Sequence, residues 1–349
     1  MKKILHIIPN FSFGGAEIYL YDVLKNYNYK THEIYVITIK KNVIFFENEL
    51  KSIEGLNLII LDVPSLVNFF WLYSVYKNIK NIAPDIVHSH LNIALLSSIL
   101  FKPLFKAKYV TTQHSVYCNT SLYYKLIIRL TNCYDFVLSN SEYTRKHLVE
   151  NKYNKKSNII TYPLGIDFHR YKVDPKLRSN VLNELGISEN KIILGNIGSY
   201  KFQKGHSYLI ESFEKSKKIN SDLHLILVGD GELKNEIIAE VNDRGLKENV
   251  TFVSSTVNVS KYFNCFDVYC STSISESFGI TLLESILFHV PIVAFDTDAI
   301  PELVQHKKTG ILVKKGNTNQ FAIELISLIN NEILMSKIKE TQKQFVNNY

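Results

Sequence analysis

Short apolar runs rich in β-branched residues alternate with amphipathic segments along most of this 349-residue chain. The runs are continuous rather than alternating, as expected for strands that are buried on both faces of a parallel sheet. The segments between them repeat apolar residues at helical spacing, which predicts helices that cover the sheet. The pattern fades near residues 165–186 and then restarts. We therefore expect two doubly wound parallel α/β domains.

The expected elements and domains can be given by residue range. The predicted strands are Ile4–Ile8, Glu33–Ile39, Leu56–Leu61, Ile86–His88, Lys108–Thr112, Phe136–Ser139, Asn158–Thr161, Ile192–Ile197, His224–Val228, Val250–Val253, Val268–Cys270, Ile292–Ala294 and Gly310–Val313. The predicted helices include Ala16–Asn26, Leu66–Asn81, Ser207–Lys218, Leu233–Arg244, Thr281–Phe288, Gln320–Glu332 and a polar helix from Lys337 to Tyr349. The predicted boundaries are 1–168 for the first domain, 169–188 for a linker, 189–335 for the second domain and 336–349 for the terminal helix.

Composition excludes several other classes of protein. Hydrophobic residues make up 46% and charged residues 21%, which argues against a disordered chain, a collagen-like fibre and a coiled coil. The apolar run Ile93–Phe101 is too short to cross a membrane. The run Ile4–Pro9 is too short for the core of a signal peptide. We expect a cytoplasmic protein.

The cysteines and glycines exclude further classes. No CxxC pair is formed by the four cysteines, Cys118, Cys133, Cys265 and Cys270. We therefore expect neither a zinc site nor a disulfide framework, and we expect the cysteines to be buried, reduced thiols. Gly14-Gly15 lacks the GxGxxG spacing of a dinucleotide fingerprint, which argues against a dehydrogenase.

The positive charge is concentrated in the first half of the chain. Residues 1–170 hold 20 Lys and Arg against 12 Asp and Glu, whereas residues 171–349 hold 20 against 21. Much of the excess lies among aromatic residues in Phe101–Arg129. Such a stretch suits a membrane surface that holds anionic lipid, or it is an ordinary solvated face. The chain carries no recognisable nucleic-acid-binding signature.

The segment Ser273–Ser285 carries the strongest chemical signal. Glu276 and Glu284 are eight positions apart, after a predicted strand and into a predicted helix. We expect Glu276 in the loop and Glu284 in the first turns of the helix. The amides of Phe278, Gly279 and Ile280 would then form an anion site at the helix N-terminus. Two carboxylates around an anion site suit a sugar nucleotide, although spacing alone also fits two surface carboxylates.

This segment resembles the E-x7-E signature of the retaining glycosyltransferases of family 4, which have the GT-B fold. Other segments resemble further motifs of that family, in the same order along the chain. They are Gly14-Gly15-Ala16-Glu17, Asp85-Ile-Val-His88-Ser-His90, Thr111-Thr-Gln-His114, Gly165-Ile-Asp167, Gly198 to His206, Val228-Gly229-Asp-Gly231 and Ile300-Pro301-Glu302-Leu303. The resemblance implies two Rossmann-like domains that face a central cleft, the first for the acceptor and the second for the donor.

The resemblance also implies residue roles. Lys204, together with the Gly198-Ser199 turn, would neutralise the donor diphosphate. Glu276 would hold hydroxyls of the transferred sugar beside the Phe278–Ile280 amides, and Glu284 would bind the nucleotide ribose. His114 would face the sugar near the reacting carbon. Gly14 and Gly15 would let the first loop close over the acceptor and phosphate.

The implied activity is metal-independent, retaining transfer of a hexose-type sugar from a nucleoside diphosphate donor, such as a UDP-sugar, to a saccharide or a lipid-linked saccharide. The basic first domain suggests an acceptor at the inner face of the cell membrane, as in capsule, exopolysaccharide or O-antigen assembly. The alternatives are a GT-B epimerase and a non-catalytic relative that binds a sugar nucleotide or a glycan. A phosphorylase would need a pyridoxal phosphate lysine motif, which does not appear.

The chain departs from the family pattern at four places. Ser199 stands where an Arg is expected, and Lys201 or Arg145 could replace that cation. His289 and the pair Asp298-Ala299 stand where glycines are expected, and the crossing terminal helix could be short or absent. Asp296-Thr-Asp298 spells the DxD of metal-dependent transferases, but without a third ligand it favours an ordinary loop.

Overall fold

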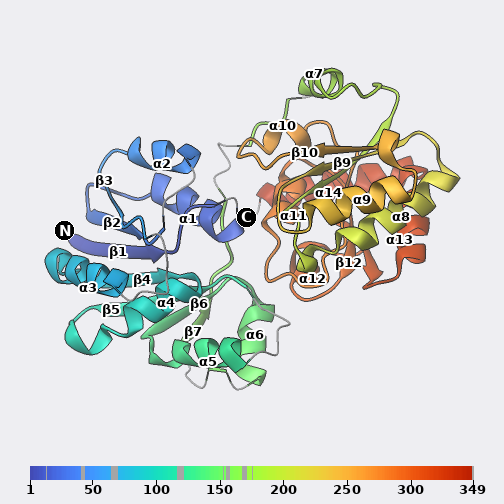
Figure 1. The fold of residues 1–349 in the computed structure, drawn as a ribbon. Helices are drawn as coiled ribbons and strands as arrows, with labels where there is room; N and C mark the ends of the chain where they lie inside the picture. Colours follow the sequence, from blue (N-terminus) through green and yellow to red (C-terminus); the bar gives the residue numbers. More distant parts are fainter. Residues whose placement is uncertain are drawn as a thin grey trace. The chain divides into compact units, whose positions relative to one another are not determined.

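The computed structural model describes residues 1–12, 14–40, 44–63, 70–115, 122–151, 153–154, 158–166, 171–174 and 176–347. The chain divides into unit 1, Met1–Ile166, and unit 2, Asp167–Tyr349, and each is described by itself (Figure 1). Phe13, Cys118 and Asp167, which lie in segments singled out above, and the end of the chain at residues 348–349, are outside the described residues.

Unit 1 is built around one parallel sheet with the strand order β3-β2-β1-β4-β5-β6-β7. The order reverses between β1 and β4, which is where ligands bind in open α/β sheets. The strands are β1 (Lys2–Ile8), β2 (His32–Thr38), β3 (Leu56–Ile60), β4 (Ile86–His90), β5 (Lys108–Gln113), β6 (Phe136–Ser139) and β7 (Ile159–Thr161). The helices are α1 (Gly15–Lys25), α2 (Ile44–Lys51), α3 (Phe70–Ile82), α4 (Leu91–Ile99), α5 (Leu122–Leu130) and α6 (Glu142–Glu150).

Unit 2 repeats this plan with the parallel order β10-β9-β8-β11-β12-β13. Its order reverses between β8 and β11. The strands are β8 (Ile192–Ile197), β9 (Leu223–Val228), β10 (Val250–Val253), β11 (Val268–Ser271), β12 (Ile292–Asp296) and β13 (Gly310–Lys314). The helices are α7 (Leu177–Glu184), α8 (His206–Ile219), α9 (Lys234–Asp243), α10 (Ser260–Phe263), α11 (Ile280–Leu287), α12 (Ile300–Leu303), α13 (Thr318–Ile329) and α14 (Glu332–Asn347).

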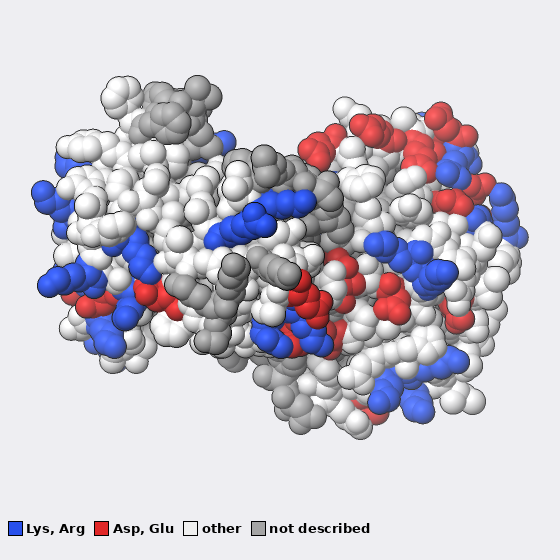
Figure 2. Space-filling model, turned by 90° about the horizontal axis from the view of Figure 1, so that it is seen from below, with Lys and Arg blue, Asp and Glu red and all other residues white. Residues whose placement is uncertain are grey.

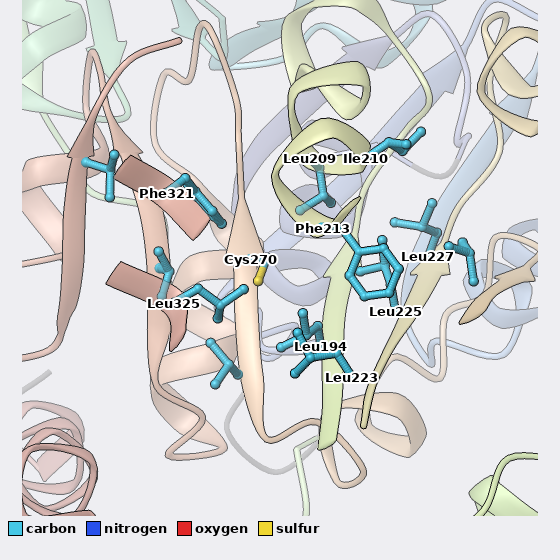
Figure 3. Close-up of a cluster of buried hydrophobic side chains, with 14 of the residues drawn as sticks. Leu194, Leu209, Ile210, Phe213, Leu223, Leu225, Leu227, Cys270, Phe321 and Leu325 are labelled. Atoms are coloured by element: carbon cyan, nitrogen blue, oxygen red, sulfur yellow. The ribbon is translucent and has the colours of Figure 1, made fainter. Parts of the chain in front are cut away.

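Each unit has its own apolar core, which fixes the sheet and hence the loops at its edge. In unit 2, Phe213 of α8 packs with Leu194 and Leu225 of the sheet, and Phe321 of α13 belongs to the same cluster (Figure 3). In unit 1 the cluster joins Leu5 and Val87 of the sheet to Trp71 and Val75 of α3. Burying one such side chain contributes about 1.5–3 kcal/mol.

The prediction of two parallel Rossmann-like sheets is confirmed, and each predicted strand coincides with an observed one. The predicted linker is different, because it contains α7. Arg178 of α7 donates hydrogen bonds to the Cys265 carbonyl (2.6 Å) and to the Asp267 carboxylate (3.0 Å). The helix is therefore fastened to unit 2, by contacts that apolar periodicity does not reveal.

Two smaller expectations also need correction. The terminal helix begins at Glu332, earlier than predicted, and it packs on α11 and α13. One face of this helix is buried, because Ile338 and Gln342 are inaccessible to solvent. Cys133 is exposed, whereas Cys265 and Cys270 are buried as expected. Among the described residues, the helices are all too short or too polar to cross a lipid bilayer.

Candidate active site

The sheet order of unit 2 brings two predicted site loops together. Strands β8 and β11 are parallel neighbours, so the loops at their carboxyl ends adjoin. The Ile274 amide donates to the Gln203 carbonyl (2.8 Å) and the Thr272 hydroxyl to the Gly205 carbonyl (2.9 Å). Gly205 has φ 63°, and a Cβ there would lie 2.2 Å from the Thr272 carbonyl oxygen. Only glycine fits this approach.

The joined loops place Lys204 against Glu276. The Lys204 ammonium donates to Glu276 Oε2 at 2.6 Å, and the two side chains are 27% and 13% exposed. The sequence predicted both residues at the site, and the structure brings them into direct contact. A half-buried cation at a sheet edge can bind an anionic ligand more strongly than an exposed one, because water screens it less. In this pair, the Lys204 ammonium is a cation that can bind phosphate, and the Glu276 carboxylate is an acceptor that can bind hydroxyl groups.

Asp298 holds the Glu276 loop from the other side. Its carboxylate accepts hydrogen bonds from the Ser275 hydroxyl (2.8 Å) and from the Glu276 amide (3.1 Å). Asp298 has φ 50°, so it keeps the left-handed conformation that the glycine expected here would adopt readily. Asp296 is exposed, and the Asp298 carboxylate is used by this loop. Asp298 thus has a backbone conformation that glycine favours, and its carboxylate adds two hydrogen bonds to the Glu276 loop.

Helix α11 begins at the site. Gly279 caps it with φ 92°, and its carbonyl accepts from the Leu282 amide (2.9 Å) and the Leu283 amide (3.2 Å). The first amides of a helix have no partner within the helix. Those of Gly279 and Ile280 stand at this end, next to the loop that carries Glu276. The geometry is suitable for the predicted anion site.

Glu284 lies in the second turn of α11 and is only 2% exposed. Its Oε1 accepts a hydrogen bond from the Tyr171 hydroxyl at 2.7 Å. Tyr171 in turn packs edge-on against Phe288, with ring centroids 6.1 Å apart. The burial rules out the alternative in which Glu284 is an ordinary surface carboxylate. Tyr171 lies in the predicted linker, and no sequence pattern pointed to it.

The missing family Arg leaves Lys201 as the cation nearest in sequence to Ser199. The Ser199 carbonyl accepts from the Lys201 amide (2.8 Å), and the Lys201 side chain is exposed in the same loop as Lys204. Arg145, the other suggested substitute, belongs to α6 in unit 1. Its guanidinium is held by both oxygens of Glu142 at 2.8 and 2.5 Å. Gly198 is close to Lys204, because a Cβ at Gly198 would contact the lysine side chain at 3.8 Å.

In unit 1, the glycine loop already faces a carboxylate. A Cβ on Gly14 would lie 2.3 Å from Glu17 Oε2, and the Ser12 hydroxyl donates to Glu17 Oε1 at 2.9 Å. Glu17 is buried at the start of α1, and Gly15 begins that helix. The loop therefore packs against the Glu17 carboxylate, and its closure over the acceptor and phosphate stays a prediction.

His114 follows β5 at the carboxyl edge of the unit 1 sheet. It lines a cavity of about 300 Å³, together with Pro9, Leu91, Asn92 and Gln113. Burial, with a smaller effect of His88, lowers the pKa of His114 to about 3. The ring is therefore neutral at pH 7, so it can form hydrogen bonds to a sugar without carrying a charge.

Three more histidines, which are His6, His88 and His90, lie close to His114, and no role was predicted for them from the sequence. The β1–β4 register pairs His6 with His88, and His90 is two residues further along β4 on the same face. Burial lowers the pKa of His6, His88 and His90. The spacing of His88 and His90 at i and i+2, beside a histidine in the first strand, is the signal that could have revealed them.

Nitrogen atoms of His6, His88 and His90 lie within 4.8 Å of one another, close enough to share a metal ion. The ring arrangement is less suitable. His88 and His90 lie with centroids 4.2 Å apart and planes 34° apart, and His6 and His90 are stacked at 24°. Nitrogen lone pairs lie in the ring plane, so near-parallel rings direct them side by side rather than toward one point.

Comparison with known proteins agrees with this architecture. The family model described as Glycosyltransferase Family 4 matches residues 13–170, and the model described as Glycosyl transferases group 1 matches residues 178–345. The crystal structure of Anabaena HepE in complex with UDP and glucose covers 100% of this chain and 95% of its own, with a TM-score of 0.87 and 20% identity.

Two curated relatives are similar in sequence. N-acetyl-alpha-D-glucosaminyl L-malate synthase of Bacillus anthracis is 32% identical over 163 residues, which are 47% of this chain and 42% of the relative. The chain thus spans less than half the length of that relative. O-antigen chain mannosyltransferase C of Escherichia coli is 26% identical over 279 residues, 77% of this chain and 72% of the relative.

The two parallel sheets have the GT-B fold of the similar structure, and glycosyltransferase family models match both units, so the chain is a glycosyltransferase of the GT-B class. The Glycosyltransferase Family 4 model matches unit 1 and the Glycosyl transferases group 1 model matches unit 2, so the chain is a glycosyltransferase of the family 4 type.

Proposed function

We propose that this chain transfers a sugar, with retention of its anomeric configuration, from a nucleoside diphosphate donor to a saccharide or lipid-linked saccharide. The observation that carries the proposal is the Lys204–Glu276 pair, 2.6 Å apart beside the start of α11. UDP is the first nucleotide to test, because the structurally similar HepE was crystallised with it.

The electrostatics of unit 2 suit departure of a diphosphate. Breaking the anomeric bond leaves negative charge on the diphosphate and positive charge on the sugar ring. Lys204 and the α11 amides would stabilise the first, and Glu276, which contacts Lys204, would accept hydrogen bonds from the sugar. Groups fixed in place before the reaction need no reorganisation, which is the main source of such stabilisation. No metal ion enters this scheme.

Binding and turnover test the proposal together. UDP, GDP and ADP are titrated into the full chain by calorimetry. Lys204→Met should weaken binding of the preferred nucleotide by about 10-fold or more, the value of one charge-assisted hydrogen bond. Lys218→Met is the matched control, because Lys218 forms a similar ion pair with Glu214 (2.7 Å) on the surface of α8.

Turnover is then followed as release of UDP from UDP-glucose, with octyl glycosides as acceptors. Release that depends on acceptor supports transfer, and the anomeric configuration of the product by NMR tests retention. Nucleotide binding without release would favour the non-catalytic alternative. Interconversion of the donor sugar without acceptor would favour the epimerase.

Contact with a membrane through unit 1 is part of the proposal. Leu100 and Leu104 are 57% and 63% exposed, and Lys106 and Lys108 are exposed beside them. Tyr76 of α3 joins this surface, with its ring 5.6 Å from that of Phe101. Apolar side chains next to lysines suit anionic lipid. On the face shown in Figure 2, basic side chains lie over both parts of the molecule.

Flotation with vesicles tests this contact. The chain should float with vesicles that contain 30% phosphatidylserine by design, and floating should be lost at high salt, because the attraction is screened. Lys106→Glu with Lys108→Glu should weaken it about 30-fold or more, because each lysine contributes about 1 kcal/mol and each glutamate adds repulsion. Equal flotation with uncharged vesicles would contradict a role for these lysines.

A further inference from the structure

We propose that Tyr27, His6 and His90 form a hydrogen-bonded chain that fixes which nitrogen of His114 carries its proton. They would be positioning residues for His114, whose contact with sugar is itself part of the proposed function. Tyr27 follows α1, His6 lies in β1, His90 lies in β4 and His114 follows β5. These four elements are labelled in Figure 1.

Each member of this hydrogen-bonded series lies within hydrogen-bond distance of the next. The Tyr27 hydroxyl lies 3.0 Å from His6 Nε2, and His6 Nδ1 lies 3.1 Å from His90 Nε2. His90 Nδ1 lies 3.1 Å from His114 Nε2. Both ring nitrogens of His6 and both of His90 are thus used, inside a unit where those rings are 1% and 0% exposed. Buried polar groups require such partners.

These contacts couple the tautomers. A neutral imidazole carries one N–H and one lone pair, and each link needs one of each. If His90 donates from Nδ1 to His114, it must accept at Nε2 from His6, which then accepts at its own Nε2 from Tyr27. The three histidines therefore all carry the proton on Nδ1, or all carry it on Nε2. A mixed set would place two N–H groups, or two lone pairs, face to face.

Tyr27 decides between the two arrangements. Burial, with a smaller effect of Tyr162, raises the pKa of Tyr27 to about 12, so the hydroxyl keeps its proton at pH 7. A phenol is a better donor than acceptor, because its oxygen lone pair is delocalised into the ring. Tyr27 therefore donates to His6, which places the proton of His114 on Nδ1. Nε2 of His114 accepts a hydrogen bond from His90, so this nitrogen is not available to the sugar.

The surroundings keep this chain neutral. Among the described residues, the titratable groups that face it are His88, Tyr19 and, beside Tyr27, Tyr29 and Tyr162. The His88 ring is 5.1 Å from that of His6, and the Tyr19 ring is 5.9 Å from that of His114. Nε2 of His88 contacts the Thr112 hydroxyl at 2.8 Å, so His88 lies beside the chain and outside it. The lowered histidine pKa values favour neutral rings at pH 7.

Nitrogen NMR of the full chain with ¹⁵N-labelled histidine tests the inference without any substrate. Two-bond ¹H–¹⁵N spectra report the tautomer of each ring, and His114→Gln identifies the signals of His114. In the native chain, His6, His90 and His114 should all be the Nδ1–H tautomer. Tyr27→Phe removes the terminal donor, so His114 should become a mixture or shift to Nε2–H, although Tyr27 lies three links away.

Tyr29→Phe is the matched control. Tyr29 packs beside Tyr27, with centroids 6.3 Å apart, but its hydroxyl donates to the Leu24 carbonyl. This variant should leave His114 unchanged. Different tautomers among the three histidines of the native chain, or an unchanged His114 in Tyr27→Phe, would overturn the inference. So would stoichiometric zinc in the purified chain that His88→Gln removes, because the cluster would then be a metal site.

Kinetics separate this inference from the proposed function. In Tyr27→Phe, kcat for transfer should fall about 5-fold, the value of roughly one hydrogen bond, while KM for the donor stays the same. A tautomer shift in a chain that transfers no sugar would leave the inference standing and defeat the proposed function. If the native chain transferred sugar but Tyr27→Phe left the tautomer of His114 unchanged, the proposed function would stand and the inference would be wrong.

Discussion

The carboxyl edges of the two sheets have the same topology and opposite chemistry. In unit 1 the edge holds four histidines whose pKa values burial lowers, so it is neutral and rich in hydrogen bonds. In unit 2 the edge holds an ion pair, Lys204 with Glu276, and a buried carboxylate, Glu284. One fold thus supports a hydrogen-bonding edge and an ionic edge, because the loops and strand ends differ while the strand order is the same apart from the additional β7.

The difference fits the parts of the proposed donor. A diphosphate carries full charges, which an ammonium group and helix amides stabilise. Sugar hydroxyls carry none, and neutral imidazoles bind them without the cost of burying an ion. The comparison predicts that changes at the ionic edge act on phosphate and on turnover, whereas changes at the histidine edge act on orientation and on pH dependence.

The largest effect is expected from Glu276→Ala. The variant should lower turnover by about 10²–10⁴-fold, as loss of a group that contacts the reacting sugar does. Because Glu276 also competes for Lys204 (2.6 Å), binding of UDP should be unchanged or tighter. Turnover and calorimetry on the same preparation check both results.

Glu214→Ala removes the partner of Lys218 on α8 and serves as the control. It should leave turnover unchanged. Near-normal turnover in Glu276→Ala would remove that residue from the site, and weaker UDP binding would show that the ion pair holds Lys204 in place rather than competing with the phosphate.

The second prediction concerns stability of unit 1 in acid. Four histidines of unit 1, which are His6, His88, His90 and His114, have lowered folded-state pKa values, about 4 for His88 and about 3 for His114. Below the unfolded pKa, near 6.5, the unfolded chain binds more protons than the folded one, so stability falls as pH falls through 6.5 toward these values. Four such groups lower the free energy of unfolding by at most about 4 kcal/mol between pH 6.5 and 5.5.

Urea unfolding followed by the fluorescence of Trp71 measures this, because the single tryptophan is buried in unit 1. His88→Gln should make the pH dependence shallower by about one proton. His224→Gln, in unit 2, should leave the Trp71 signal as it is. A urea midpoint that is constant from pH 7 to 5.5 would mean that the histidines are already protonated when folded.

Asp298→Ala should have a smaller effect at the ionic edge. It removes the hydrogen-bond acceptor of the Ser275 hydroxyl and the Glu276 amide. It also places alanine, which has no polar side chain, at the left-handed φ of 50°. We expect turnover to fall about 10-fold through a looser Glu276 loop. Asp298→Gly should recover part of the loss, since glycine adopts this conformation freely. Full activity in Asp298→Ala would show that the hydrogen bonds from Ser275 and Glu276 to Asp298 are not needed for turnover.

The sequence was sufficient for the sheets and for part of the site. Buried parallel strands leave continuous apolar runs, so β1 to β13 could be located, and the order of family motifs pointed to Lys204 and Glu276. Helix α7 was missed because Arg178 fastens it through polar contacts. Tyr171 was missed because only the fold brings it to Glu284, 113 positions away. The link of His6 to His90 depends on strand order, which adjacency in sequence does not give.

The smallest effect is expected from removal of metal ions. EDTA should leave transfer within about twofold of the untreated value, because the Asp298 carboxylate binds the Glu276 loop and two carboxylates make a poor cation site. A large loss would have two possible origins, and the two edges can be separated. If Asp296→Asn abolished the metal requirement, the ion would lie at the ionic edge; if His88→Gln did so, it would lie among imidazoles, which favour zinc over magnesium. In the second case the histidine edge would hold a metal cation and would not be neutral. Both units would then carry a cation at the carboxyl edge of the sheet, and the contrast between a neutral edge and an ionic edge would be wrong.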